Sequence, residues 1–343
     1  MDTAPACVPA VVVTAIGNSP IKTSLKLNTT GAVAFGISVT LLAGIWFWNA
    51  THQISSALFV VCPGLGFITM LWLGSDSVLE RLDKWVRVQP ARITVIPAAL
   101  WLLYLAYAAG MGIADARSAL VLSAYLAVPF LAMSFTAKIE PLVVLWLWLP
   151  MEFGILRNIL ITRTTGADLH YVFAQLLALD TGIIAFAVWN RTPSIGYRFE
   201  ADKRILSVGL IHFALFALIA IPLGLTIGFI RYSFTVSKLY TAPLLFIGIF
   251  LFTAVPEEFL FRGLIQNWIE RTTQKQGFSL IAASVIFGAS HLNNGPPIPN
   301  YKYFFMASIA GLFYGRAWRS TGSLMASSMT HALVDTFWSL AFR

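Results

Sequence analysis

Three short clusters in the C-terminal third of the chain place ionisable residues inside stretches that are otherwise strongly apolar. They read EExxxR from Glu257 to Arg262, FxxxH ending at His291, and HxxxD from His331 to Asp335. A titratable group inside a bilayer costs several kcal/mol unless it pairs or lines a wet cavity, so such groups mark a site by default. Carboxylates and imidazoles together can take a proton from water and hold a developing charge.

The first cluster contains two adjacent acids in different situations. At about 100° per residue, Glu258 and Arg262 stand one turn apart on one helix face, while Glu257 points about a quarter-turn away. One carboxylate therefore has a built-in partner and its neighbour is free to act on water. Pro256 removes a backbone donor and predicts a kink. The alternative is a purely structural Glu258–Arg262 pair, with Glu257 facing the membrane boundary.

The other two clusters have the spacing of single helix faces. Phe287 and His291 share a face just before a helix-ending Asn-Gly-Pro-Pro sequence, and a lone histidine there can also be a capped or interfacial group. His331 and Asp335 are one turn apart, which allows a hydrogen bond that sets the imidazole tautomer. In isolation such a pair can simply hold helices together. Three clusters in order favour a site.

The composition identifies the elements that must position these residues. The chain has 343 residues, of which 58% are hydrophobic and only 11% charged, too apolar for a soluble core. Apolar runs near the length of a membrane span, about 20 residues, recur throughout. We predict an all-α, polytopic transmembrane bundle of about eleven helices, within a range of 8–11, at 33–48, 54–73, 93–111, 119–135, 141–159, 171–189, 205–230, 242–269, 278–292, 303–318 and 324–342.

The distribution of basic residues predicts the orientation. With the N-terminus in the cytoplasm, fifteen Lys and Arg residues fall on the inner side and seven on the outer side, as the positive-inside rule requires. The net charge of +8 then suits anionic lipid headgroups, and no nucleic-acid partner is expected. We predict an integral, multi-pass membrane protein without a cleavable signal peptide. Cys7 and Cys62 suggest neither a disulfide nor a metal motif.

Chemistry-bearing residues are unevenly distributed along the chain. We predict a cytoplasmic tail at 1–30, an accessory region of about six helices at 31–204, and a site-bearing domain at 205–343 with its motifs at 242–342. Three other intramembrane residues lack a motif. Glu152 can pair with Arg157 near a helix end, and Asp180 can contact His212 or belong to an ion pathway.

The three motifs in this order resemble the CPBP family, the CAAX protease and bacteriocin-processing intramembrane endopeptidases that include Rce1-like proteases. The resemblance covers 242–342 and implies glutamate-activated hydrolysis of a peptide bond within the membrane. It implies that Glu257 is the general base and His291 its partner in binding the water. Glu258 would be held by Arg262, and His331 with Asp335 would bind the developing oxyanion. Many relatives carry Asn in place of Asp335, and an ionised Asp cannot donate to an oxyanion.

Other interpretations remain open at the level of sequence. Glu257, His291, His331 and Asp335 also form a donor set typical of catalytic zinc, although we favour a mechanism without cofactor or metal. A transporter with buried acids would predict internal repeats, and none is apparent. A catalytically silent scaffold is a third possibility. The expected partners are the bilayer and a membrane protein or lipidated peptide substrate; the sequence carries no signal for an oligomeric state.

Overall fold

The apolar runs fold as helices, as predicted, in a computed structural model that describes residues 25–26, 29–51, 57–160 and 167–342. The predicted tail at 1–30 lies almost wholly outside the described residues. Two short strands, β1 (Leu25–Lys26) and β2 (Glu200–Ala201), pair antiparallel, with Leu25 opposite Ala201. The helices are α1 (Thr29–Thr51), α2 (Leu58–Leu73), α3 (Asp76–Val88), η1 (Pro90–Thr94), α4 (Val95–Gly110), α5 (Ala116–Phe135), η2 (Ala137–Ile139), α6 (Glu140–Glu152), α7 (Ile155–Leu160), α8 (Ala167–Ile183), η3 (Ile184–Trp189), α9 (Lys203–Thr226), η4 (Val236–Tyr240), α10 (Ala242–Ile249), η5 (Phe250–Ala254), α11 (Val255–Glu258), η6 (Phe259–Gln266), α12 (Asn267–Thr273), α13 (Gln276–Ala289), α14 (Tyr301–Thr321) and α15 (Leu324–Ala341).

Each of the eleven predicted runs corresponds to helical structure, which confirms the all-α membrane class. The run at 141–159 is interrupted after α6, where Gly154 adopts a positive φ of 68° and α7 begins. In the described part of the chain, five helices are long and apolar enough to span a membrane, or six if α2 and α3 form one bent span. The others in the described part of the chain are shorter, interrupted or less apolar over the length that was described. The chain is an integral membrane protein.

Helix α3 is an element that apolar runs do not reveal. It is polar overall, begins 93° away from the direction of α2, and buries only Val86. Its apolar residues recur with a helical period on one side, as in helices that lie along a surface rather than cross a bilayer. A search for apolar stretches misses this pattern because charged residues separate the apolar ones.

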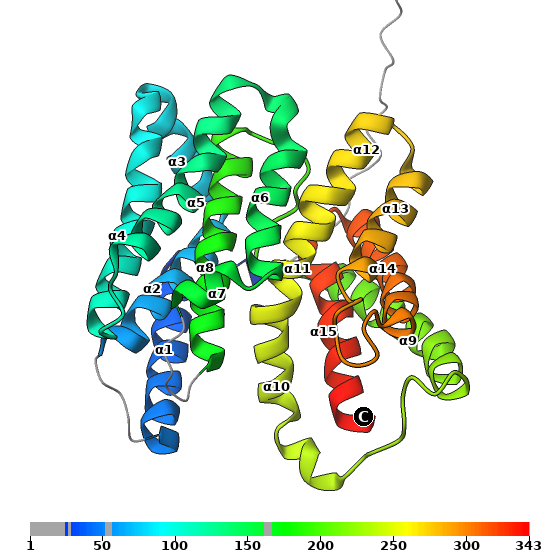
Figure 1. Cartoon of the computed structure of the whole chain (residues 1–343). Helices are drawn as coiled ribbons and strands as arrows, with labels where there is room; N and C mark the ends of the chain where they lie inside the picture. Colours follow the sequence, from blue (N-terminus) through cyan, green and yellow to red (C-terminus); the bar gives the residue numbers. More distant parts are fainter. Residues whose placement is uncertain (1–24, 27–28, 52–56, 161–166, 343) are drawn as a thin grey trace, which may run out of the picture.

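The N-terminal and C-terminal helices lie side by side (Figure 1). Helix α8 packs against α2, α5 and α6, while α13, α14, α15 and α9 form a second set of contacts. The rod from Ala242 to Thr273, comprising α10, η5, α11, η6 and α12, stands between them and contacts α6 through η6. The two groups of helices therefore share one boundary, which runs along the segment that carries Glu257.

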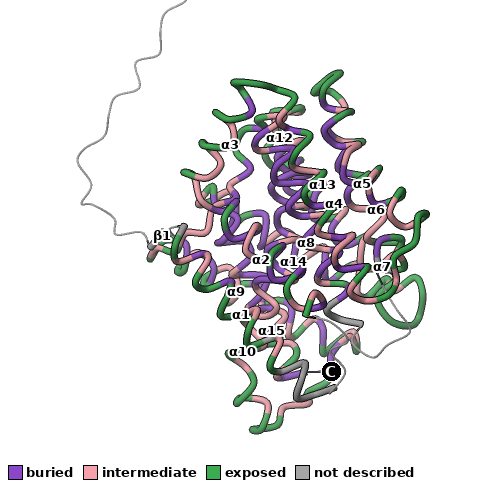
Figure 2. Tube along the Cα trace, turned by 90° about the vertical axis from the view of Figure 1, so that its left-hand side faces the viewer, coloured by how far each residue is buried: buried purple, intermediate pink, exposed green. Residues whose placement is uncertain are grey.

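Burial follows the arrangement expected of a protein in lipid. Buried segments gather in the interior of the bundle, around α8 and α12 to α14 (Figure 2). Large apolar side chains on peripheral helices are instead exposed, among them Leu42 at 66% on α1, Leu218 at 74% on α9 and Leu244 at 75% on α10. Apolar surface of this kind requires a hydrocarbon environment.

Charged residues form ion pairs and hydrogen bonds with one another at the end of the bundle where α3 and α12 lie (Figure 1). Asp83 of α3 pairs with Arg87 and, across 108 positions of sequence, with Arg191. Glu140, at the start of α6, accepts hydrogen bonds from Arg271 of α12 and from Asn190. We refer to this end of the molecule as the basic end. Its contacts join the N-terminal helices to the rod.

Candidate active site

The rod is irregular on both sides of the paired acids. The π-helical segments η5 and η6 flank α11, a single α-helical turn that begins with Val255 and Pro256 and ends with Glu258. Proline cannot donate the usual backbone hydrogen bond, and π-helical turns occur frequently at functional sites. The predicted kink at Pro256 is not seen as a break of the rod, which runs as one helix from Ala242 to Thr273, and the proline lies instead in a short α-helical turn between two π-helical segments.

Glu258 is completely buried and fully engaged. One carboxylate oxygen, Oε2, accepts from Arg262 Nε at 2.9 Å and from the Ser327 hydroxyl, and the other, Oε1, lies 2.9 Å from His331 Nδ1. The side chains of Glu258 and Arg262 are both 0% exposed. Charge-assisted bonds to all three partners hold this carboxylate in place, so it is a positioning group rather than one that can meet substrate.

Glu257 has the opposite environment. Its side chain is 30% exposed, its Oε2 atom has no hydrogen-bond partner among the described residues, and its closest cationic neighbour is His331 Nε2 at 3.9 Å. It lines a cavity of about 360 Å³ together with His291. Of the two adjacent acids, Glu257 is the one that can reach a water molecule.

His331 lies between carboxylates on both sides of its ring. Nδ1 contacts Glu258, while Nε2 lies 3.3 Å from Asp335 Oδ2. Ionised carboxylates only accept hydrogen bonds, so only the imidazolium form can donate from both nitrogens. The ring is stacked on Tyr314, with centroids 4.5 Å apart and planes inclined by 15°. Three carboxylates then face two cations, Arg262 and His331, and among the described residues Oε2 of Glu257 accepts no hydrogen bond.

His291 is oriented by its own helix. Its Nδ1 lies 2.9 Å from the Phe287 carbonyl, which assigns the proton to Nδ1 and leaves Nε2 as an acceptor. The ring packs against Phe287 and Tyr303, with centroids 4.7 and 4.8 Å away. Since His291 and Glu257 line the same cavity, the two can bind one water between them.

Arg262 is held beneath the site by rings as well as by Glu258. Its guanidinium carbon lies 5.2 Å from the Phe287 ring centroid and 5.9 Å from that of Tyr314. These cation–π contacts compensate in part for the burial of the charge. Within the described structure, Nη1 and Nη2 have no hydrogen-bond partner.

The cavity has a wall from each group of helices. Half of its lining residues come from the rod and the turn that follows α13, and half come from α6, Gly154 and α8. His331 and Asp335, predicted to bind the oxyanion, are not among its described lining residues. Asp335 is instead 37% exposed beside His331. The oxyanion role stays a prediction, because no described residue of α15 lines this cavity although His331 Nε2 lies 3.9 Å from Glu257 Oε2.

The donor set considered as the zinc alternative is not gathered around one point in the described structure. No group of three or more His, Cys, Asp or Glu residues in the described part of the chain is placed to hold a metal ion. Both nitrogens of His331 face carboxylates, and Nδ1 of His291 faces a carbonyl. His331 therefore donates hydrogen bonds from both nitrogens and has no lone pair for a metal, whereas Nε2 of His291 keeps its lone pair.

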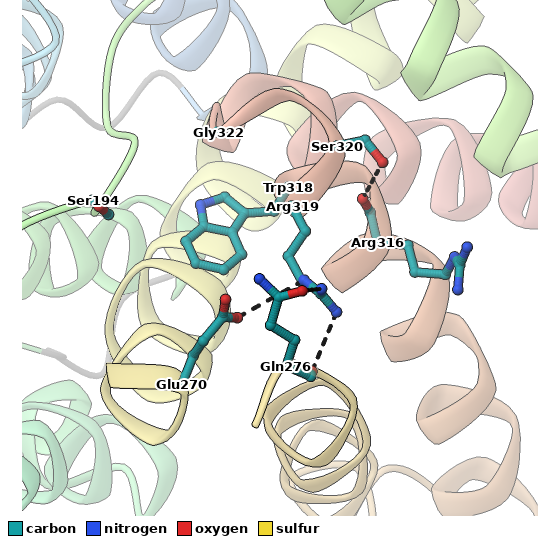
Figure 3. Close-up of a pocket in the computed structure, with 8 residues that line it drawn as sticks. All are labelled: Ser194, Glu270, Gln276, Arg316, Trp318, Arg319, Ser320 and Gly322. Carbon is teal, nitrogen blue, oxygen red and sulfur yellow. Dashed lines mark hydrogen bonds and ion pairs between the residues drawn. The ribbon is translucent and has the colours of Figure 1, made fainter. Parts of the chain in front are cut away.

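A second cavity, of about 420 Å³, lies at the basic end and holds a different kind of network (Figure 3). There Arg319 donates to the Gln276 carbonyl at 3.2 Å and lies 3.8 Å from Glu270 Oε2. The side chain of Arg316 points away from this group. Glu270 is already paired with Arg319, and no histidine is among the described residues that line this cavity. The cavity therefore offers no base for hydrolysis.

The remaining intramembrane polar residues have separate environments. Asp180 is 0% exposed and neither of its carboxylate oxygens has a partner among the described residues, while His212 Nδ1 contacts the Val208 carbonyl. The predicted contact between Asp180 and His212 is wrong. Glu152 accepts from Trp148 Nε1 at 3.2 Å. The side chain of Arg157 lies outside the described residues, so its pairing with Glu152 stays a prediction.

Two contributors to the site were missed by the motifs. Ser327 donates to Glu258, and Tyr314 stacks on His331. Ser327 precedes His331 by four residues and so shares its helix face, a spacing that could have identified it. No local pattern singles out Tyr314, because its contact depends on how α14 packs against α15.

Comparison with known proteins agrees with the resemblance carried by the motifs. Residues 238–337 match the family model of type II CAAX prenyl endopeptidase Rce1-like proteins, so the C-terminal part of the chain carries an Rce1-like domain. The match includes the residues of the three motifs and none of α1 to α9, of which α6 and α8 supply the other wall of the cavity. Searches of curated proteins and of solved structures gave no match.

Proposed function

We propose that this protein is an intramembrane endopeptidase that hydrolyses a peptide bond of a membrane-associated protein or peptide. The observation that carries the proposal is the difference between the two adjacent acids: Glu258 is saturated by three partners, whereas Glu257 lines a cavity with His291. The Rce1-like match at 238–337 supports a protease. We propose two candidate reactions, the processing of a lipidated CAAX terminus and the processing of a C-terminal tail.

In the proposed reaction, a water molecule binds between Glu257 and His291 Nε2. Glu257 takes the proton from the water as oxygen attacks the substrate carbonyl, and the same proton can later pass to the leaving amine. Glu258, Arg262 and Ser327 hold His331 as an imidazolium beside Glu257, which stabilises the negative charge of the reacting groups. Asp335 orients Nε2 of that imidazolium. No step requires a metal.

The decisive variant is Glu257→Gln. General-base catalysis contributes about 10²–10⁴-fold, so turnover should fall by that factor. Folding should be unaffected, because Oε2 has no hydrogen bond to lose. Comparing membrane proteomes of cells that carry the wild type or Glu257→Gln should reveal uncleaved substrate in the variant alone. Glu270→Gln, at the basic end, is the matched control. Identical proteomes for the wild type and Glu257→Gln would refute the proposal. Ion flux into proteoliposomes without any cleavage would favour a transporter.

A second test concerns the metal. Exhaustive chelation should leave the purified enzyme active, because the proposed water is held by a carboxylate and an imidazole. A zinc enzyme would instead lose activity and recover it on addition of Zn²⁺ alone. The measurement is the cleavage rate of one substrate before chelation, after chelation and after restoration with individual metals.

We also propose that the basic end faces the cytoplasm, in agreement with the excess of Lys and Arg in its loops. The cavity residues Glu152, Tyr171 and Asn294 are exposed or nearly so and lie at the other ends of their helices, so substrate would approach from the opposite side. Labelling of single cysteines introduced at Lys275 and at Asn294 in intact cells tests this. A membrane-impermeant reagent should modify the second position only.

A further inference from the structure

The wall of the cavity that faces the catalytic segment contains an acid with no assigned role. Glu152 ends α6 and lines the same cavity as Glu257. Glu152 belongs to the helices outside the region that matches the Rce1-like family. Its presence in the cavity therefore has to be explained from this chain itself.

The contacts of Glu152 with the described residues do little to stabilise it. A carboxylate in the last turn of a helix faces the negative end of the helix dipole, which is a destabilising placement. The single hydrogen bond that the described structure gives it comes from Trp148 Nε1 at 3.2 Å, which occupies one of its two oxygens. Residues that break local rules without a structural gain occur most often at functional sites.

The charge balance of the cavity indicates what it would bind. Among its described lining residues there are two carboxylates and no Lys or Arg, and the other polar groups include Gln175, Ser290 and Asn294. A negatively charged segment of substrate would be repelled from both walls. A cationic side chain could bind Glu152 while the adjacent peptide bond reaches Glu257 on the facing wall.

We propose that Glu152 selects the substrate, by binding a Lys or Arg side chain that lies close to the scissile bond of a membrane-associated peptide. This inference rests on the proposed function, because it takes Glu257 as the residue beside the bond that is cut. Glu152 acts in recognition and does not take part in the chemical step. The N-terminal helices thus supply specificity to a cavity whose reacting groups come from the C-terminal helices.

The test uses the full-length enzyme in detergent micelles with a defined mixture of synthetic peptides that samples every residue on both sides of the bond. Cleavage products are identified by mass spectrometry. The wild type should favour peptides with Lys or Arg near the cut by about tenfold to a hundredfold over those with Glu, as expected for a charge-assisted hydrogen bond. Glu152→Gln should abolish this preference, and Glu152→Lys should favour acidic peptides.

The controls separate this inference from the function on which it rests. Continued cleavage of neutral peptides shows that the Glu152 variants are folded, and Glu270→Gln should retain the wild-type preference. If Glu152→Lys still prefers peptides with Lys or Arg near the cut, or if the wild type shows no preference for charge, Glu152 does not select the substrate. In either case, loss of cleavage in Glu257→Gln still supports the proposed protease. Cleavage that persists in Glu257→Gln would instead remove the proposed function.

Discussion

Replacing Arg262 by methionine should destabilise the protein far more than the same change at Arg87. Both arginines pair with an acid four residues earlier through Nε, but the Arg262–Glu258 side chains are 0% exposed and those of Arg87 and Asp83 are 61% and 23% exposed. Breaking a buried pair costs about 3–5 kcal/mol because it strands a charge. Losing an exposed pair costs about 0.2–1 kcal/mol.

The contacts of Glu258 place the expected loss at the lower end of that range. After Arg262→Met, the carboxylate keeps Ser327 and His331 as donors. Methionine also preserves apolar contact with Phe287 and Tyr314, so little cavity is created. We expect about 3 kcal/mol for Arg262→Met and under 1 kcal/mol for Arg87→Met.

The assay is the free energy of unfolding in one detergent, measured by denaturant titration for the wild type and both variants. The double variant Glu258→Gln with Arg262→Met removes the stranded charge and should recover part of the loss, as a double-mutant cycle would detect. Equal destabilisation by Arg262→Met and Arg87→Met would refute the reasoning, since the predicted difference arises from burial alone.

Three further changes test the surroundings of the site. Gly288→Ala should lower the free energy of unfolding by about 1–3 kcal/mol and reduce activity, because a Cβ there would lie 2.5 Å from the Phe304 carbonyl and displace the turn that carries His291. Gly277→Ala on the same helix is the control, because its Cβ would meet nothing within 4 Å. Equal effects of the two substitutions would contradict the packing argument. Asp335→Asn should keep the initial cleavage rate within about tenfold of the wild type, because an amide oxygen can still accept from His331 Nε2. A rate as low as that of Glu257→Gln would show that the charge of the carboxylate is itself essential. Glu140→Gln should lower the unfolding free energy by about 1–3 kcal/mol by weakening its bond to Arg271, and an unchanged unfolding curve would show that this contact does not join the two groups of helices.

The spacing of residues along one helix predicted the contacts that form within that helix. Arg262 contacts Glu258, and Asp335 contacts His331, because residues four apart share a face. The contact of His331 with Glu258 joins residues 73 positions apart, and no helical period contains it. The same limit applies to the cavity wall from α6 and α8, which depends on how separate helices pack. The catalytic roles and the domain boundary near 204 stay predictions.

The π-helical segments on either side of Glu257 determine how the site depends on the length of the rod as well as on its side chains. A π-helical turn accommodates one residue more than an α-helical turn, so a one-residue deletion within η5 can be absorbed by a return to the α-helical register. A one-residue deletion within α10, which is regular α-helix, would instead turn everything after it by about 100°. Glu257 would leave the cavity although no residue of the site had been changed. Insertions and deletions that preserve every motif are thus a route by which such a chain can lose activity and still remain a membrane-spanning bundle.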